Sequence, residues 1–157
     1  MSEMVRRNWF FTETWNFKQP PPREADEFFA KAIVMCAKGD GELSQPERDF
    51  IVGYFATIGA PESMIEELRS YEGDDDLNAM VAPIPDPGIH NAIVYFALKA
   101  CSADGDLSDG ERSRIHKLAH QLNIKPDVVN SIYDLYQEEL VMRDKRLKVL
   151  FPAGSPF

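Results

Sequence analysis

The chain has 157 residues, which is enough for one domain with a hydrophobic core and short for two. Hydrophobic residues make up 44% and charged residues 27%, values typical of a globular protein, so the composition disfavours wholesale disorder. The formal net charge is −9. A general nucleic-acid-binding protein is therefore disfavoured, because a phosphate-binding face needs positive charge.

The charge is unevenly distributed along the chain. Residues 24–139 carry 23 acids and 9 bases, a net charge of −14. The two ends together carry 3 acids and 8 bases, a net charge of +5. This division predicts an aromatic and proline-rich N-terminal arm over residues 1–23, a two-repeat helical domain over 24–139, and a basic C-terminal helix extension and tail over 140–157.

The N-terminal arm is dense in aromatic residues but lacks a clean helical period, and Pro20–Pro22 predicts a short extended spacer after it. Two interpretations are open. The arm packs back on its own domain, or it docks into a protein partner, because clustered Trp and Phe are costly to leave in water. The candidate partner contacts are Trp9, Phe10, Phe11, Trp15 and Phe17.

From Ala25 onward, apolar residues recur every three or four positions, which predicts α-helices. Pro61 and Pro126 each begin a helix, the proline-rich segment 82–88 is a connector, and the last helix is expected to run on to Leu150. No stretch alternates as a strand would. We therefore expect an all-α fold, a single bundle of about six to eight helices.

An internal repeat relates residues 37–48 to residues 101–112 at an offset of 64. The flanking segments agree in kind, with an apolar helix before and an amphipathic helix after each copy. This agreement predicts two pseudo-symmetric repeats within one bundle. The identical pairs are Asp40/Asp104, Gly41/Gly105, Leu43/Leu107, Ser44/Ser108, Glu47/Glu111 and Arg48/Arg112, and Glu42/Asp106 keeps the charge.

Helix capping explains most of the repeated residues. The segments 44–47 and 108–111 both read Ser-x-x-Glu, the capping box in which side chains and backbone amides at a helix start satisfy each other. Gly41 and Gly105 are expected to take the left-handed conformation that ends a helix. In this interpretation the turns are purely structural.

A cation site is the alternative interpretation of the same turns. The sequence is similar to the second half of an EF-hand loop, but neither copy has the two early carboxylates, so a high-affinity EF-hand is not expected. A different site built from oxygen ligands would suit Ca²⁺ or Mg²⁺. Its candidate ligands are Asp40, Glu42, Glu47, Asp104, Asp106 and Glu111.

Other chemistry is weakly supported. His116 and His120 have the spacing of a helical zinc pair but lack the adjacent Glu of zinc proteases, so we expect solvated or interface histidines. No serine-hydrolase, P-loop or dinucleotide motif occurs, and we expect no enzymatic activity. Cys36 and Cys101 lie in apolar segments, which predicts buried free thiols, with a disulfide or a metal thiolate pair as the alternative.

No apolar segment at the N-terminus reads as a secretory signal, and no window is long enough for a transmembrane helix. We therefore expect the cytoplasm or another reducing intracellular compartment. The C-terminal extension mixes bases with apolar residues. We expect it to fold across its own acidic domain or to reach an acidic protein, in preference to an anionic membrane surface. Its candidate contacts are Arg143, Lys145, Arg146 and Lys148.

The two copies resemble the TerB-like domain of tellurite-resistance and related stress-response proteins, which also occurs in similar form in a membrane-anchored J-domain co-chaperone. The resemblance covers about residues 25–139 and is carried by an apolar helix, the Asp-Gly-acid-Leu-Ser-x-x-Glu motif and a second amphipathic helix. The resemblance implies an all-helical domain with no known catalytic activity. It also implies acidic residues thought to chelate divalent metal, and these correspond to the six candidate ligands named above.

From these observations we expect a non-catalytic protein-interaction module, attached to a larger assembly through its aromatic N-terminal and basic C-terminal ends. The alternative is a stress-response protein that binds a divalent cation of the Ca²⁺ or Mg²⁺ type through the duplicated acidic turns.

Overall fold

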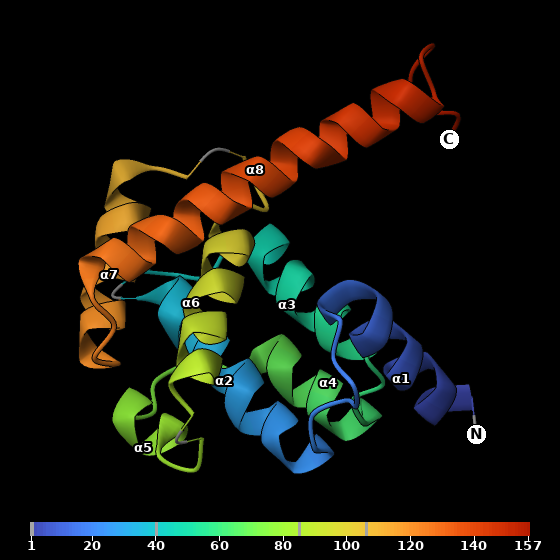
Figure 1. The fold of residues 1–157 in the computed structure, drawn as a ribbon. Coiled ribbons are helices and arrows are strands. Elements are labelled where there is room, and N and C mark those ends of the chain that lie inside the picture. The colour runs from blue at the N-terminus through green and yellow to red at the C-terminus, as the bar shows by residue number, and fades with distance from the viewer. Residues whose placement is uncertain (1, 40, 85, 106) are drawn as a thin grey trace.

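The structure, a computed structural model, describes residues 2–39, 41–84, 86–105 and 107–157. Within these ranges it contains eight α-helices, one short 3-10 helix and no strand (Figure 1). The predicted all-α fold is confirmed. The elements are α1 (Ser2–Trp15), η1 (Arg23–Ala25), α2 (Asp26–Lys38), α3 (Gln45–Thr57), α4 (Glu62–Ser70), α5 (Leu77–Val81), α6 (Pro87–Cys101), α7 (Asp109–Gln121) and α8 (Pro126–Leu150).

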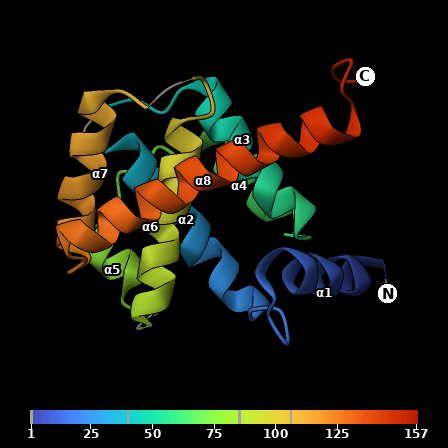
Figure 2. The same ribbon diagram turned by 45° about the horizontal axis from the view of Figure 1, so that its top comes forward.

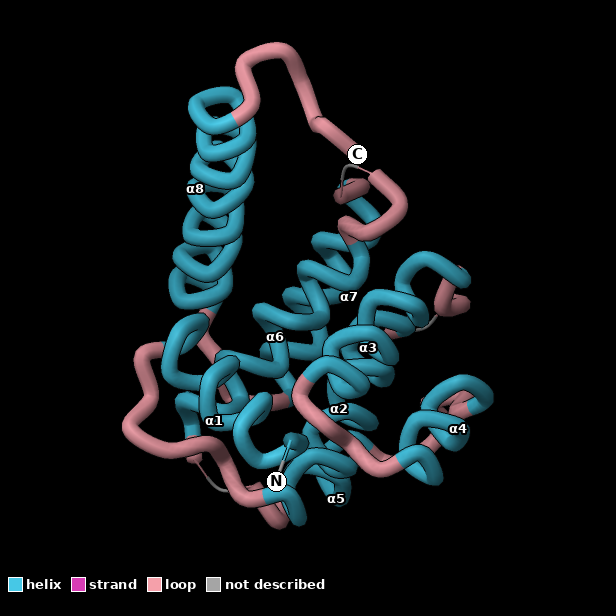
Figure 3. Tube along the Cα trace, turned by 90° about the vertical axis from the view of Figure 1, so that its right-hand side faces the viewer, coloured by secondary structure: helices cyan, strands magenta, loops and turns pink. Residues whose placement is uncertain are grey.

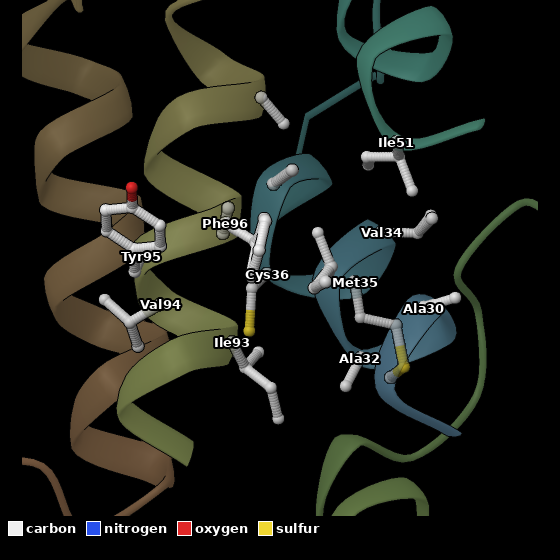
Figure 4. Packing of buried hydrophobic residues seen from close by; sticks show 14 of the residues in the cluster. Ala30, Ala32, Val34, Met35, Cys36, Ile51, Ile93, Val94, Tyr95 and Phe96 are labelled. Carbon is white, nitrogen blue, oxygen red and sulfur yellow. The ribbon is translucent and has the colours of Figure 1, made fainter. Parts of the chain in front are cut away.

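The centre of the bundle is the pair α2 and α6, which pack more extensively against each other than any other two elements. Both helices are apolar around most of their circumference, and such helices are stable only when they are surrounded by protein. Figure 4 shows side chains of this core between α2, α6 and α3, among them Val34 and Cys36 on α2 and Ile93 on α6.

Cys36 and Cys101 are both buried and free, as expected from the apolar segments that contain them. Burial raises the pKa of each thiol to about 12, because the thiolate loses its hydration in the core. The Cys101 thiol donates a weak hydrogen bond to the carbonyl of Ala37, 3.4 Å away. The two cysteines therefore behave as small core residues.

The N-terminal arm differs from the sequence prediction, because residues 2–15 form the helix α1. The aromatic residues obscured the period in the sequence, but they supply the face that contacts the domain. Phe11 is 5% exposed and belongs to the core, and Trp15 contacts the rings of Tyr95 and Phe96. Of the two interpretations of the arm, the structure shows the one in which it packs back on its own domain.

A buried ion pair fastens the arm to α2. Arg7 is 3% exposed, and its two terminal nitrogens donate to the two carboxylate oxygens of Asp26 at 2.8 and 2.9 Å. The same guanidinium also donates to the carbonyls of Pro21 and Ile58. Because a planar guanidinium matches a carboxylate at two points, this pair fixes the position of α1 as well as its attachment.

The last helix, α8, extends to Leu150 as predicted. Val129 and Tyr136 are buried in its first half, whereas every side chain from Val141 onward is exposed. Figures 1 and 3 show this half of α8 projecting away from the other helices. The expectation that the extension folds across its own domain is therefore wrong. A continuous helix holds its direction unless Pro, Gly or a bulge bends it, and residues 127–150 contain neither Pro nor Gly.

None of the helices in the described part of the chain combines the length and the hydropathy that crossing a membrane requires.

Candidate metal centre

The two repeated turns begin their helices in the same way. Ser44 caps α3 and Ser108 caps α7, and each serine hydroxyl accepts from the backbone amide three residues later, at 3.4 and 3.2 Å. The carboxylates of Glu47 and Glu111 return to the serine amides at 2.6 and 2.8 Å. Both predicted capping boxes are confirmed, and they fix one oxygen of each glutamate.

A glycine that the capping interpretation did not name ends α2. Gly39 has a φ of +57° and stands at the C-terminus of that helix. A Cβ atom at Gly39 would stand 2.8 Å from Cδ of Arg114 on α7. Gly39 therefore serves both the chain reversal and the close passage of Arg114. In the second turn Gly105 does have a positive φ, of +143°.

Three acids from the two turns meet at one place. Glu47, Asp104 and Glu111 each offer a carboxylate oxygen, and these oxygens lie within 4.8 Å of one another. We call these three residues the acidic cluster. Figures 1 and 2 show the starts of α3 and α7, which carry Glu47 and Glu111, near one edge of the bundle, and Asp104 lies in the turn after α6. The hydroxyl of Ser44 also donates to Asp104 at 3.4 Å, so one hydrogen bond joins the two turns.

The acidic cluster concentrates negative charge where water is partly excluded. Glu47 is 3% exposed, Glu111 is half-buried and Asp104 is exposed. The N-termini of α3 and α7 offset part of this charge, because the helix dipole favours anions there. Burying a carboxylate still carries a large desolvation penalty unless it is paired. The arrangement therefore favours a positive charge at its centre.

Arg114 is a residue of this site that the sequence interpretation missed. It lies on α7 one turn after Glu111, and its guanidinium passes Gly41 closely. Burial is the main cause that raises the pKa of the Cys101 thiol. The charges of Glu47 and Glu111 raise this pKa further, and the charge of Arg114 lowers it. Arg114 is therefore within electrostatic reach of the acidic cluster. The sequence does place Arg114 three residues, or one helical turn, after the repeated Glu111. The repeat did not single it out, because the first copy has Phe50 at the equivalent position.

The structure places the other predicted ligands as follows. Glu42 is exposed in the loop between α2 and α3, outside the acidic cluster. Asp40 and Asp106 lie outside the described residues. Half of the six candidate ligands are thus brought together in the part of the chain that the structure describes.

The predicted partner contacts divide into two groups. Phe11 is a core residue, and Phe10 and Trp15 are half-buried against Tyr54 and Phe96, so these three serve the protein's own packing. Trp9 and Phe17 are 64% and 43% exposed. The four bases of the C-terminal extension, Arg143, Lys145, Arg146 and Lys148, are all exposed.

Comparison with known proteins gives the chain a family. A family model described as "Protein of unknown function (DUF533)" matches residues 7–136. No curated protein matches the chain. Among solved structures, the chain is similar to the crystal structure of a tellurite resistance protein from Nostoc punctiforme, with 32% identity and a TM-score of 0.92 over 99% of this chain and 98% of that chain.

This match extends beyond the repeated motif, because at 99% of the chain it includes α1 and nearly all of α8. The arm and the extension are therefore parts of a shared fold, although the sequence resemblance covered only the region between them. The chain belongs to the DUF533 family, and it is a TerB-like helical protein.

Proposed function

We propose that this protein is a non-catalytic divalent-cation-binding domain of the Ca²⁺ or Mg²⁺ type. One observation carries the proposal: Glu47, Asp104 and Glu111, from two turns 64 residues apart in the repeat, direct carboxylate oxygens to one point. Capping alone requires each glutamate to stay at its own helix start. It does not require the two helix starts to meet, nor Asp104 to join them.

The spacing of the oxygens supports a hard cation. Calcium binds oxygen ligands at roughly 2.3–2.6 Å, so two ligands on opposite sides of the ion stand about 4.6–5.2 Å apart. The separation of the three oxygens, at most 4.8 Å, fits within that sphere. Backbone carbonyls and water commonly complete such a site, whereas zinc prefers nitrogen and sulfur ligands.

A bound cation would connect the two halves of the molecule. The acidic cluster joins the first turns of α3 and α7 to the turn after α6, and the Ser44–Asp104 hydrogen bond already bridges them. Neutralising the buried charge of Glu47 would stabilise the folded state by mass action, because the unfolded chain does not hold the three acids together. Cation binding should therefore raise the melting temperature.

Calorimetric titration with Ca²⁺ and with Mg²⁺ tests the proposal. Glu111→Gln is the most informative variant, because glutamine keeps the capping bond to the Ser108 amide and removes only the charge. We expect it to weaken cation binding at least tenfold while the melting temperature without added cation changes little. Asp104→Asn should weaken binding similarly.

Glu62→Gln is the matched control, because Glu62, like Glu111, is an acid in the first turn of a helix, and it is exposed and lies outside the acidic cluster. It should bind the cation as the wild type does. If neither cation releases heat, or if Glu62→Gln and Glu111→Gln bind alike, the cation proposal is wrong and the turns serve capping only.

A second candidate function, protein interaction, is favoured by the exposed end of α8. Val141, Met142, Val149 and Leu150 are each more than 60% exposed there, beside the four bases. Such an apolar and basic surface is typical of an interaction site for an acidic protein. Replacing Arg143, Lys145, Arg146 and Lys148 by Ala should abolish salt-sensitive capture of such a partner. If anionic vesicles bind the wild-type chain at equal strength, a membrane surface replaces the protein partner.

A further inference from the structure

A hollow of about 380 Å³ lies where the N-terminal arm meets the domain. Its walls come from α1, α2, α3 and α6, and we call it the aromatic pocket because its main wall residues include Phe11, Trp15, Phe29, Tyr54 and Phe96. It is separate from the acidic cluster, since none of the three clustered acids lines it. Phe17 and Ile89, which are 43% and 37% exposed, also line it and mark its opening to solvent.

The hollow is open to solvent on one side, and its volume of about 380 Å³ falls within the range of about 300–1,000 Å³ that ligand pockets have. Rigid contacts hold the walls apart. The ring of Phe96 contacts those of Tyr54, Phe29 and Trp15 at centroid distances of 4.4, 5.7 and 5.6 Å. These rings brace one another and oppose collapse of the space between them.

The lining also defines the polarity of an occupant. Among the described residues that line the pocket there is no Lys or Arg. Its acids are Asp26, whose two oxygens are held by Arg7, and Asp86, whose Oδ1 accepts from the amide of Gly88 at 2.7 Å. An anion would find no lysine or arginine among these lining residues, and a strongly polar molecule would lose its hydration against the aromatic walls.

We propose that the aromatic pocket binds an uncharged, predominantly apolar small molecule, and that the N-terminal arm completes the site. The arm contributes Phe11 and Trp15 from α1 and Phe17 from the turn that follows it. The docked position of α1 depends on the Arg7–Asp26 pair, which stands beside the same pocket. The arm is thereby explained as one wall of a binding site, a role separate from cation binding at the acidic cluster.

Binding can be measured with N-phenyl-1-naphthylamine, an uncharged apolar dye whose fluorescence rises in apolar sites. We expect saturable binding of one dye per chain to the full-length protein. Decanol should displace the dye, and decanoate, which has the same chain length but is anionic above pH 7, should compete at least tenfold more weakly. Equal competition by decanoate would overturn the assignment of an uncharged occupant.

A variant that fills the pocket locates the site. Ala92 is a half-buried wall residue of α6, and Ala92→Phe should reduce dye affinity at least tenfold. Ala79→Phe is the matched control, because Ala79 is exposed on α5 and does not line the pocket. It should bind the dye as the wild type does. Undiminished binding by a folded Ala92→Phe protein would overturn the proposal.

Methyl NMR on the wild-type chain tests the location without any variant. Decanol should shift the δ-methyl signals of Ile58, Ile84 and Ile89, which line the pocket, and leave that of Ile115 on α7 unchanged. The absence of saturable shifts at the three lining isoleucines would overturn the proposal even if Ala92→Phe fails to fold. Neither result depends on added divalent cation, so this test and the cation test fail independently.

Discussion

The two ends of the chain look alike in the sequence and differ in the structure. Both are basic and rich in apolar residues, and both form helices. However, α1 lies against the domain with Arg7 and Phe11 buried, whereas residues 141–150 of α8 project from it with every side chain exposed (Figures 1 and 3). The difference arises from specific partners. Arg7 forms an ion pair with Asp26 of the domain, whereas in the described residues no base of the extension forms an ion pair with the domain.

This comparison shows that net charge alone does not decide whether a basic segment docks on an acidic domain. Exposed ion pairs are weak and are screened by salt, so an acidic surface does not by itself hold a helix. Docking of α1 instead combines apolar burial with one charge pair of two-point geometry. The ends are thus expected to respond very differently to mutation.

The largest effect is expected at Arg7. Arg7→Ala should lower the free energy of unfolding by about 3–5 kcal/mol, because it leaves the buried carboxylate of Asp26 without its partner. Chemical denaturation measures the loss. The variant should also weaken dye binding in the aromatic pocket, since the arm supplies part of its wall.

Arg6→Ala is the control for Arg7→Ala. Arg6 is the exposed neighbour on the same helix, and its substitution removes the same charge. It should change stability by no more than about 0.5 kcal/mol. If the two variants lose equal stability, the positive charge of the arm and not the Arg7–Asp26 pair keeps α1 docked. Specific partners would then not explain why the two ends of the chain differ.

The sequence could predict the helical fold and the helix starts, because apolar periodicity and capping boxes are local signals. It could not choose between the two interpretations of the arm. That choice depends on Arg7 meeting Asp26 and Trp15 meeting Phe96, contacts between residues far apart in the chain. Similarly, the repeat paired Glu47 with Glu111 and Asp40 with Asp104, but the meeting of Glu47, Asp104 and Glu111 at one place depends on how α3 and α7 pack.

An intermediate effect is expected where α8 leaves the domain. The hydroxyl of Tyr95 on α6 donates to Glu139 at 2.6 Å, and the side chains beyond Leu140 are exposed. Tyr95→Phe should lower the free energy of unfolding by about 1 kcal/mol at neutral pH, because one hydrogen bond is lost. The half-buried Tyr71, whose hydroxyl donates to Asp75, offers a matched Tyr→Phe control away from α8.

The same tyrosine predicts a pH dependence. Burial, and then the hydrogen bond to Glu139, raise the pKa of Tyr95 above its ordinary value of 10. The folded state therefore favours the neutral phenol. This contribution to stability is fully present below pH 10 and is lost as the pH rises above it. Stability should fall less steeply above pH 10 in Tyr95→Phe than in the wild type, and identical slopes would show that Tyr95 titrates as freely in the folded state as in the unfolded chain.

The smallest effect on stability is expected at the end of α8. Deleting residues 141–157 removes only exposed side chains, and the ion pair between Lys148 and Asp144 lies within the deleted segment. The melting temperature, measured by circular dichroism, should therefore be unchanged, as should dye binding in the aromatic pocket. Salt-sensitive binding of an acidic protein should be lost, because the deletion removes the apolar and basic surface together. A clear drop in melting temperature would show that the extension contributes to the fold in solution, and the two ends would then differ only in degree.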